Sequence, residues 1–210
     1  MLHIPIRQGV RYADVVAKQK PAVVITDPHA IRALAHPARQ RVIDELYNGQ
    51  VLTATECAEI VGLSPSAMSY HLRALEKVGI VTRAEAGEDG RERPWRAAGT
   101  SVTITAAAAG SRLAHAASAA LAVSVLERLG ERFAAWLQRS AEESEPWQEA
   151  SGISSATLWL TLDEAQQVER ELEQIVARYR GRGTSKQPKG ARRISLDFVA
   201  FPMDPPTDLQ

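Results

Sequence analysis

The chain has 210 residues, of which 45% are apolar and 24% are charged, and 25 basic side chains balance 25 acidic ones. This apolar fraction can fill a buried core, so the composition excludes wholesale disorder. A single cysteine excludes an intrachain disulfide framework and a cysteine-rich zinc module. The sequence has neither a signal-peptide pattern nor a long uncharged apolar run, so we expect a cytoplasmic protein outside the membrane, with no cofactor and no metal site.

The neutral total is a sum over segments of opposite charge. Residues 1–50 hold seven Lys and Arg against four Asp and Glu, residues 140–175 hold nine acids and one base, and residues 176–193 hold seven bases and no acid. Phosphate binding depends on the local face that meets the phosphates, so a net charge of zero does not exclude a nucleic-acid partner. A neutral chain is instead expected to bind DNA weakly when the binding is nonspecific, so that contacts to the bases provide the selectivity.

Two helices are predicted in the first organised block. Asp27 can cap a helix that begins at Pro28, a residue that suits the first turn. Pro37 lacks an N–H and restricts the residue before it, so the helix breaks at His36. A second helix then runs from Pro37 to about Tyr47.

A pair of short helices follows. Thr53 and Glu56 have the spacing of a capping box, and Gly62 ends the helix that they begin. Ser64 then caps a helix over residues 65–78. Two short helices joined by a tight glycine-containing turn, about 20 residues in all, have the dimensions of a helix-turn-helix.

The second of these helices has two distinct faces. Its inward face is predicted to hold Met68, Leu72, Leu75 and Val78. Its outer face is short, polar and basic, without an acid, and comprises Ser66, Ser69, Tyr70, Arg73 and Lys77. Such side chains can reach base edges and phosphates from within a major groove.

A basic hairpin is predicted directly after this helix. Residues 80–84 and 93–97 have strand composition and flank a polar turn over residues 85–92. This is the layout of a wing, in which Arg91 and Arg93 can reach a DNA backbone or minor groove, although three acids in the turn make its charge mixed.

Together these motifs resemble the ArsR-type winged helix-turn-helix regulators over roughly residues 25–100. The resemblance rests on the runs AIRALAHPARQRVIDEL, TATECAEIVGLSPSAMSYHLRALEKVGIV and RERPWRAA, which occur in this order. It implies a cytoplasmic homodimer that binds operator DNA and represses transcription until an effector releases it. The residues expected at the DNA are Ser64, Ser66, Ser69, Tyr70, His71, Arg73, Lys77, Arg91 and Arg93; for His71, packing inside the domain is an equal alternative.

Metal sensing by cysteines, which the founding members of this family perform, does not fit the residues present. Thr53 and Thr55 stand where such cysteines would be, and Cys57 is alone on the buried face of its helix. We interpret Cys57 as a core residue, with a thiol sensor as the alternative.

A long alanine-rich helix is predicted from Ile104 to about Arg139. Its apolar stripe consists of Leu113, Ala117, Leu121, Val125, Leu129, Phe133 and Leu137. By resemblance this is the dimerisation helix, and a two-fold dimer predicts an inverted-repeat operator with half-sites about 34 Å apart. The alternative is that the stripe packs within one chain.

The remaining residues predict a small strand-helix-strand module. Residues 156–160 and 192–201 are expected strands, and Thr161 with Glu164 forms a capping box that begins the helix between them. Trp136, Trp147 and Trp159 lie in or beside its junction with the long helix, where they either belong to the core or line an effector site.

The predicted fold class is therefore mainly α (α+β), and the domains are an N-terminal arm (1–24), a winged helix-turn-helix domain (25–100), a long dimerisation helix (101–140), a connector (141–152) and a C-terminal module (153–203). We expect a sequence-specific transcriptional regulator, a homodimeric repressor of double-stranded DNA, and no enzyme, because no nucleophile–base or phosphate-loop pattern is present. The alternatives are a helix-turn-helix used as a protein-interaction scaffold and a non-repressing regulator without small-molecule sensing.

Overall fold

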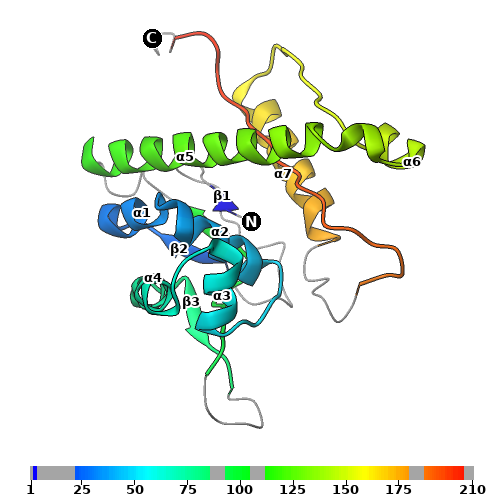
Figure 1. Ribbon diagram of the computed structural model, residues 1–210. Coiled ribbons are helices and arrows are strands. Elements are labelled where there is room, and N and C mark those ends of the chain that lie inside the picture. The colour runs from blue at the N-terminus through cyan, green and yellow to red at the C-terminus, as the bar shows by residue number, and fades with distance from the viewer. Residues whose placement is uncertain (1, 4–21, 86–92, 105–111, 180–186, 206–210) are drawn as a thin grey trace.

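The computed structural model describes residues 2–3, 22–85, 93–104, 112–179 and 187–205 (Figure 1). The elements in chain order are β1 (Leu2–His3), β2 (Val23–Ile25), α1 (Pro28–Leu34), α2 (Pro37–Tyr47), α3 (Ala54–Val61), α4 (Pro65–Lys77), β3 (Val81–Arg83), β4 (Trp95–Ala97), β5 (Val102–Ile104), α5 (Arg112–Leu137), the 3-10 turn η3 (Ser140–Glu142), α6 (Glu145–Glu149) and α7 (Leu162–Ala177). Helices dominate, which confirms the predicted class. Within the described ranges, no helix is long and apolar enough to cross a membrane.

The break between α1 and α2 is made by local capping, as the sequence predicts. The Asp27 carboxylate accepts a hydrogen bond from the His29 N–H at 3.0 Å, and His36 Nδ1 accepts one from the Ala38 N–H at 3.2 Å. Each cap is followed directly by a proline at the first helical position. The two helices therefore start independently and enclose one core.

That core joins all four helices of the first half to the strands that follow. Its fully buried members include Ile31, Leu34, Val42, Leu72, Leu75, Ile80, Trp95 and Ile104. Tyr47 packs at its edge and donates a hydrogen bond to the Ile80 carbonyl at 2.8 Å, and burial raises the pKa of its phenol. The helices α1 to α4 and the hairpin thus form a single packed unit.

Two small sheets complete this half. The strands β3 and β4 pair antiparallel, with Val81 opposite Ala97, and Leu52 bridges to Trp95. The strands β1, β5 and β2 pair in parallel, in the order β1-β5-β2, with Val23 opposite Val102. The prediction that Ile104 begins the long helix is wrong, because the β-branched run Val102–Ile104 forms the central strand of this sheet.

The long helix α5 crosses the first half along α1 (Figure 1). The face of α5 that is turned toward the first half is buried, and it consists of Ala114, Ala117, Ser118 and Leu121. Part of the predicted stripe is therefore covered within the chain. The opposite face of α5 carries Ala116, Ala119, Val123, Leu126 and Gly130, all exposed.

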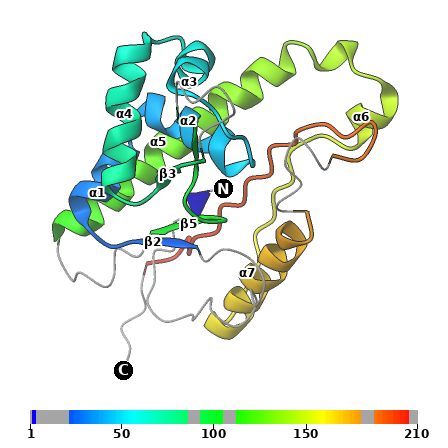
Figure 2. The same ribbon diagram turned by 90° about the horizontal axis from the view of Figure 1, so that it is seen from below.

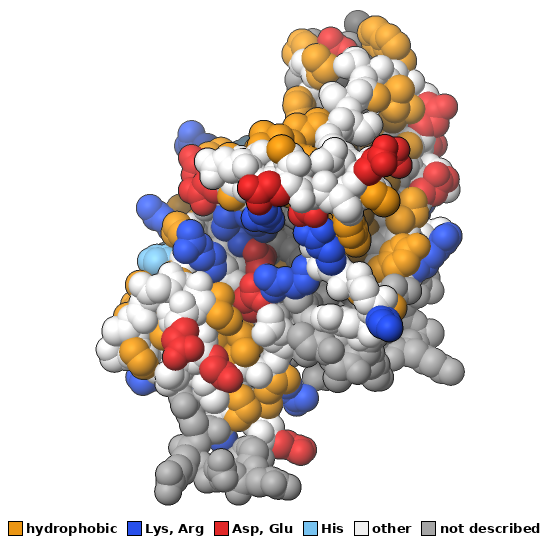
Figure 3. Space-filling view, turned by 45° about the vertical axis from the view of Figure 1, so that its right-hand side comes forward, with side chains coloured by type: hydrophobic (Ala, Val, Ile, Leu, Met, Phe, Trp, Pro, Cys, Tyr) orange, Lys and Arg blue, Asp and Glu red, His pale blue; other side chains and the backbone are white. Residues whose placement is uncertain are grey.

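Polar contacts tie the middle of α5 to α2. Gln40 donates to the Ser124 hydroxyl at 3.1 Å, and that hydroxyl donates to the Ala35 carbonyl at 3.2 Å. One turn further along α5, Arg128 forms an ion pair with Asp44. On the face of the molecule that Figure 3 shows, basic side chains lie beside acidic ones near the middle of the view. The orientation of α5 relative to α2 is thus fixed by charge as well as by packing.

The C-terminal part differs from its prediction. The connector contains the short helix α6, and α7 begins with the predicted capping box, in which Thr161 and Glu164 bond reciprocally. The predicted strands 156–160 and 192–201 are wrong: both segments are extended, but neither forms a strand. An alternating pattern favours an extended chain, but a strand also needs a neighbouring backbone, and these two segments do not pair with each other. Figures 1 and 2 both place α7 far from α4.

Candidate nucleic-acid interface

The helix α4 is positioned by the turn that joins it to α3. Thr53 accepts from the Glu56 N–H at 3.2 Å, and the Glu56 carboxylate accepts from the Thr53 N–H at 2.7 Å, which fixes the start of α3. The helix ends at Gly62, whose φ of 76° lies in the left-handed region. Ser64 then caps α4 through a 3.3 Å bond from the Ala67 N–H. Local chemistry therefore sets both ends of the turn.

The inner face of α4 is buried as predicted. Met68, Leu72 and Leu75 are each 0% exposed, and they pack in the core with residues of α2 and α3. Val78, the fourth predicted member, is only half-buried and caps the helix. The rotation of α4 about its axis is consequently set by three core side chains.

The opposite face of α4 is directed to solvent. Tyr70 is 65% exposed, and Ser66, Arg73 and Lys77 are also exposed. Ser64 and Ser66 bond to each other through their hydroxyls at 3.1 Å, and Ser69 is half-buried. One acid, Glu76, is exposed beside this face at the C-terminal end of the helix. The donors therefore concentrate toward the first three turns.

His71 lies inside the domain and not on this face. It is 9% exposed, and its ring centroid lies 4.5 Å from that of His36 and 5.6 Å from that of Tyr70. Burial, with the neighbouring His36 and Arg39, lowers the pKa of His71. The His71 imidazole packs between α4 and the start of α2, so of the two roles considered for His71 the geometry favours packing.

The wing supplies further basic groups. The Arg83 guanidinium lies 3.6 Å from the centroid of the Trp95 ring and donates to the Arg93 carbonyl at 2.7 Å. Arg93 and Arg96 are exposed. The sequence reasoning named Arg93 but missed Arg96, although its alternation with the buried Trp95 points it outward. Arg91 lies outside the described residues.

The three tryptophans proposed for an effector site have separate surroundings. Trp136 stacks near Phe133 on α5, with centroids 5.3 Å apart, and Trp147 of α6 lies 4.8 Å beneath the Arg192 guanidinium. Trp159 is 93% exposed. Within the described chain, no ring contact joins any two of them.

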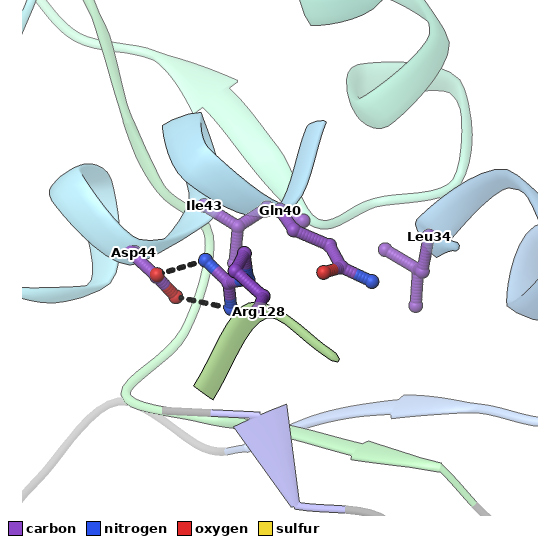
Figure 4. Close-up of a pocket in the computed structure, with 5 residues that line it drawn as sticks. All are labelled: Leu34, Gln40, Ile43, Asp44 and Arg128. Carbon is purple, nitrogen blue, oxygen red and sulfur yellow. Dashed lines mark hydrogen bonds and ion pairs between the residues drawn. The ribbon is translucent and has the colours of Figure 1, made fainter. Parts of the chain in front are cut away.

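A small cleft lies elsewhere, between α2 and α5 (Figure 4). It is lined by Leu34, Gln40, Ile43, Asp44 and Arg128, and it leaves no space in which a water molecule would fit. The Asp44–Arg128 pair closes one side of it. In this conformation it cannot hold an effector.

Comparison with known proteins identifies the domain. Residues 34–84 match the family model of a helix-turn-helix domain, and this range contains α3, the turn and α4. The chain therefore carries a helix-turn-helix domain. Over 57 residues, 27% of this chain, it is 40% identical to the HTH-type transcriptional regulator NmtR of Mycobacterium tuberculosis. Both matches fall within the part of the chain whose motifs resemble the ArsR type.

Solved structures are also similar to this chain. They include the homodimeric winged helix-turn-helix domain of Mb0332 from Mycobacterium bovis, a possible ArsR-family regulator (27% identity, 35% of this chain, 66% of that chain, TM-score 0.30). Another is Rv0081 of M. tuberculosis (26% identity, 50% of this chain, 90% of that chain, TM-score 0.32). The chain spans about half the length of NmtR, the curated relative that it matches, with 47% covered.

Proposed function

We propose that the protein is a homodimeric, sequence-specific repressor that binds an inverted-repeat operator through α4 and the wing. The observation that carries this proposal is the exposed face of α4, where Ser66, Tyr70, Arg73 and Lys77 project away from a helix held rigidly by its buried side. A helix of this kind fits the major groove, and its small polar side chains can approach base edges closely.

The wing supports the same function. Arg93 and Arg96 are exposed on the hairpin that follows α4 directly in the chain. Arginines at such a position bind phosphates, which orients the recognition helix without reading sequence. The protein-scaffold alternative fits less well, because interaction hot spots are rich in large anchors and Tyr70 is the only aromatic residue on this face.

The proposed dimer rests on the exposed face of α5. Ala116, Ala119, Val123, Leu126 and Gly130 recur at spacings of three and four residues. Val123 is 55% and Leu126 47% exposed, and no atom lies within 4 Å of the position that a Gly130 side chain would take. Small residues beside apolar ones allow two helices to approach closely, as in paired helices elsewhere.

DNA binding is tested by fluorescence anisotropy on a fragment from upstream of the gene, titrated at several salt concentrations. Arg73→Ala should weaken binding and reduce the slope of log K against log salt by about 0.9 for each half-site, the value for one lost phosphate contact. Arg139→Ala, an exposed change near the end of α5, is the matched control and should leave the slope unchanged. Binding that is absent at low salt, or equal losses in the two variants, contradicts the assignment.

The dimer is tested separately by light scattering. Leu126→Glu places a charge in the middle of the exposed α5 face and should halve the molecular mass. Glu127→Gln, at the neighbouring position, should not. A monomeric unmodified protein at micromolar concentration would refute the homodimer.

Effector control is a further part of the proposal, located at the end of α5 where Trp136 and Phe133 stack. A ligand there would change the angle between α5 and the rest of the molecule and so the spacing of the two recognition helices. Tryptophan emission that stays constant across a panel of small apolar and aromatic compounds, while DNA binding is intact, refutes this part alone.

A further inference from the structure

The hairpin of β3 and β4 is too short to hold its orientation by itself. Its strands have three residues each and form a sheet of two strands. A two-stranded hairpin is marginally stable in water, so contacts with the rest of the domain have to fix it. The proposed function depends on that fixation, because Arg93 and Arg96 can meet phosphates together with α4 only if the hairpin keeps one orientation.

Trp95 attaches one arm of the hairpin to the helix-turn-helix. Its side chain is 1% exposed and belongs to the same core cluster as Leu72 of α4. Its N–H donates to the Leu52 carbonyl at 2.6 Å, and its carbonyl accepts from the Leu52 N–H at 3.0 Å. Leu52 directly precedes Thr53, the residue that caps α3. The strand β4 is therefore fixed relative to α3 and α4 by backbone bonds as well as by burial.

Arg83 attaches the other arm to this anchor. In the register of the hairpin it lies opposite Trp95, so the two side chains share one face. The Arg83 guanidinium lies 3.6 Å from the centroid of the Trp95 ring, and its Nη1 donates to the Arg93 carbonyl at 2.7 Å. A planar guanidinium can stack on an aromatic ring and donate a hydrogen bond at the same time. One side chain thus ties β3 both to Trp95 and to the arm that carries Arg93.

These contacts distinguish Arg83 from the other two described arginines of the hairpin. Arg83 is half-buried, whereas Arg93 and Arg96 are exposed. Within the described ranges, neither of the exposed pair forms an ion pair. Their guanidinium groups can bind phosphates as they stand, but Arg83 would have to leave Trp95 to do so.

We propose that Arg83 is a positioning residue for DNA binding, which clamps β3 to Trp95 and to the Arg93 backbone and so holds the exposed wing arginines in register with α4. This proposal rests on the proposed function, since the wing needs a fixed place only if it binds DNA. Without the clamp, the basic groups of the wing are still present but are wrongly placed. DNA binding then weakens although no side chain that touches DNA has been removed.

The test compares Arg83→Ala in two backgrounds, with the upstream DNA fragment and the salt titration described above. In the otherwise unmodified protein, Arg83→Ala should reduce the slope of log K against log salt by about 0.9 to 1.8 for each half-site, the values for one and two lost phosphate contacts. In a protein that already carries Arg93→Ala and Arg96→Ala, it should leave the slope unchanged and the affinity within about twofold, because no wing contact is left to misplace. Arg139→Ala again serves as the matched control.

A second measurement follows the hairpin itself, without DNA. The Ala84 N–H donates to the Pro94 carbonyl at 2.8 Å, next to the clamp. Its hydrogen exchange should be at least about tenfold faster in Arg83→Ala than in the unmodified protein. If circular dichroism shows that Arg83→Ala is unfolded, Arg83→Met takes its place, because methionine keeps the Trp95 ring covered but cannot donate to the Arg93 carbonyl.

The outcomes separate the clamp from the proposed function. A slope that falls equally in both backgrounds means that Arg83 itself binds phosphate, which overturns the clamp and leaves DNA binding standing. An unchanged slope in the first background, or unchanged exchange at Ala84, also overturns the clamp alone. If Arg93→Ala with Arg96→Ala leaves the slope unaltered, the wing does not contact DNA, and the positioning role falls together with the wing part of the proposed function while the role of α4 stands.

Discussion

Leu72→Ala tests the rotation of α4 about its axis most directly. The leucine is 0% exposed and packs in the core between α4 and the helices beneath it. Truncation removes its apolar contacts and leaves a cavity, which costs roughly 2–5 kcal/mol in rigid cores. Because the fully buried Met68 and Leu75 lie one turn to either side on the same face of α4, little collapse is expected, and the cost should fall in the upper half of that range. For a unit of this size the melting temperature should drop by roughly 10–30 °C.

The assay is urea unfolding followed by circular dichroism. Arg73→Ala, the adjacent position, points to solvent and serves as the matched control, with a change within about 0.5 kcal/mol expected. If Arg73→Ala unfolds the protein and Leu72→Ala does not, the faces of α4 are assigned the wrong way round. If both variants keep full stability, α4 does not pack on this core at all.

Three further predictions concern the elements that hold the site in place. Asp44→Ala leaves the Arg128 side chain, which is 11% exposed, without its carboxylate partner. The free energy of unfolding should fall by about 2 kcal/mol, a value between those of surface and buried ion pairs. A loss below 0.5 kcal/mol would contradict the role of this pair. Thr53→Ala removes the cap of α3 and should cost about 1 kcal/mol in urea unfolding, whereas Thr55→Ala, an exposed change two residues later, should not. The lowered pKa of His71 means that the unfolded chain binds a proton more readily than the folded one. The contribution of His71 to stability is therefore complete above pH ~6.5 and falls as the pH drops from there toward the pKa of His71 in the folded protein. A stability that rises on acidification, or a pH dependence that is unchanged in His71→Gln, would show this reasoning to be wrong.

The helix boundaries of the first half were predictable because they depend on neighbours in the sequence. Asp27 before Pro28, and Thr53 three residues before Glu56, satisfy backbone groups within one turn, so the residues themselves locate each start. The strand β5 was not predictable in this way. Its partners, β1 and β2, lie near the other end of the domain, and the alanines that follow Ile104 favour a helix more strongly than a three-residue strand can oppose.

The candidate site shows the same division. The two faces of α4 follow from helical spacing, and the structure places Leu72 and Arg73 on the predicted sides. Spacing alone left two roles for His71, because its burial is determined by His36 on another helix. In the C-terminal part, alternation in residues 192–201 indicates which side chains share a face, but it does not indicate what lies opposite them.

The central position of β5 has a consequence for the order in which the protein folds during synthesis. Contacts within α1 to α4 join residues close in the chain, so this unit can assemble soon after it leaves the ribosome. The pairing of Val23 with Val102 must wait until β5 has emerged, and α5 follows it. A nascent chain can therefore complete α3 and α4 before α5, the helix proposed to join two copies, has emerged, so assembly on a polysome would begin with units that are already folded.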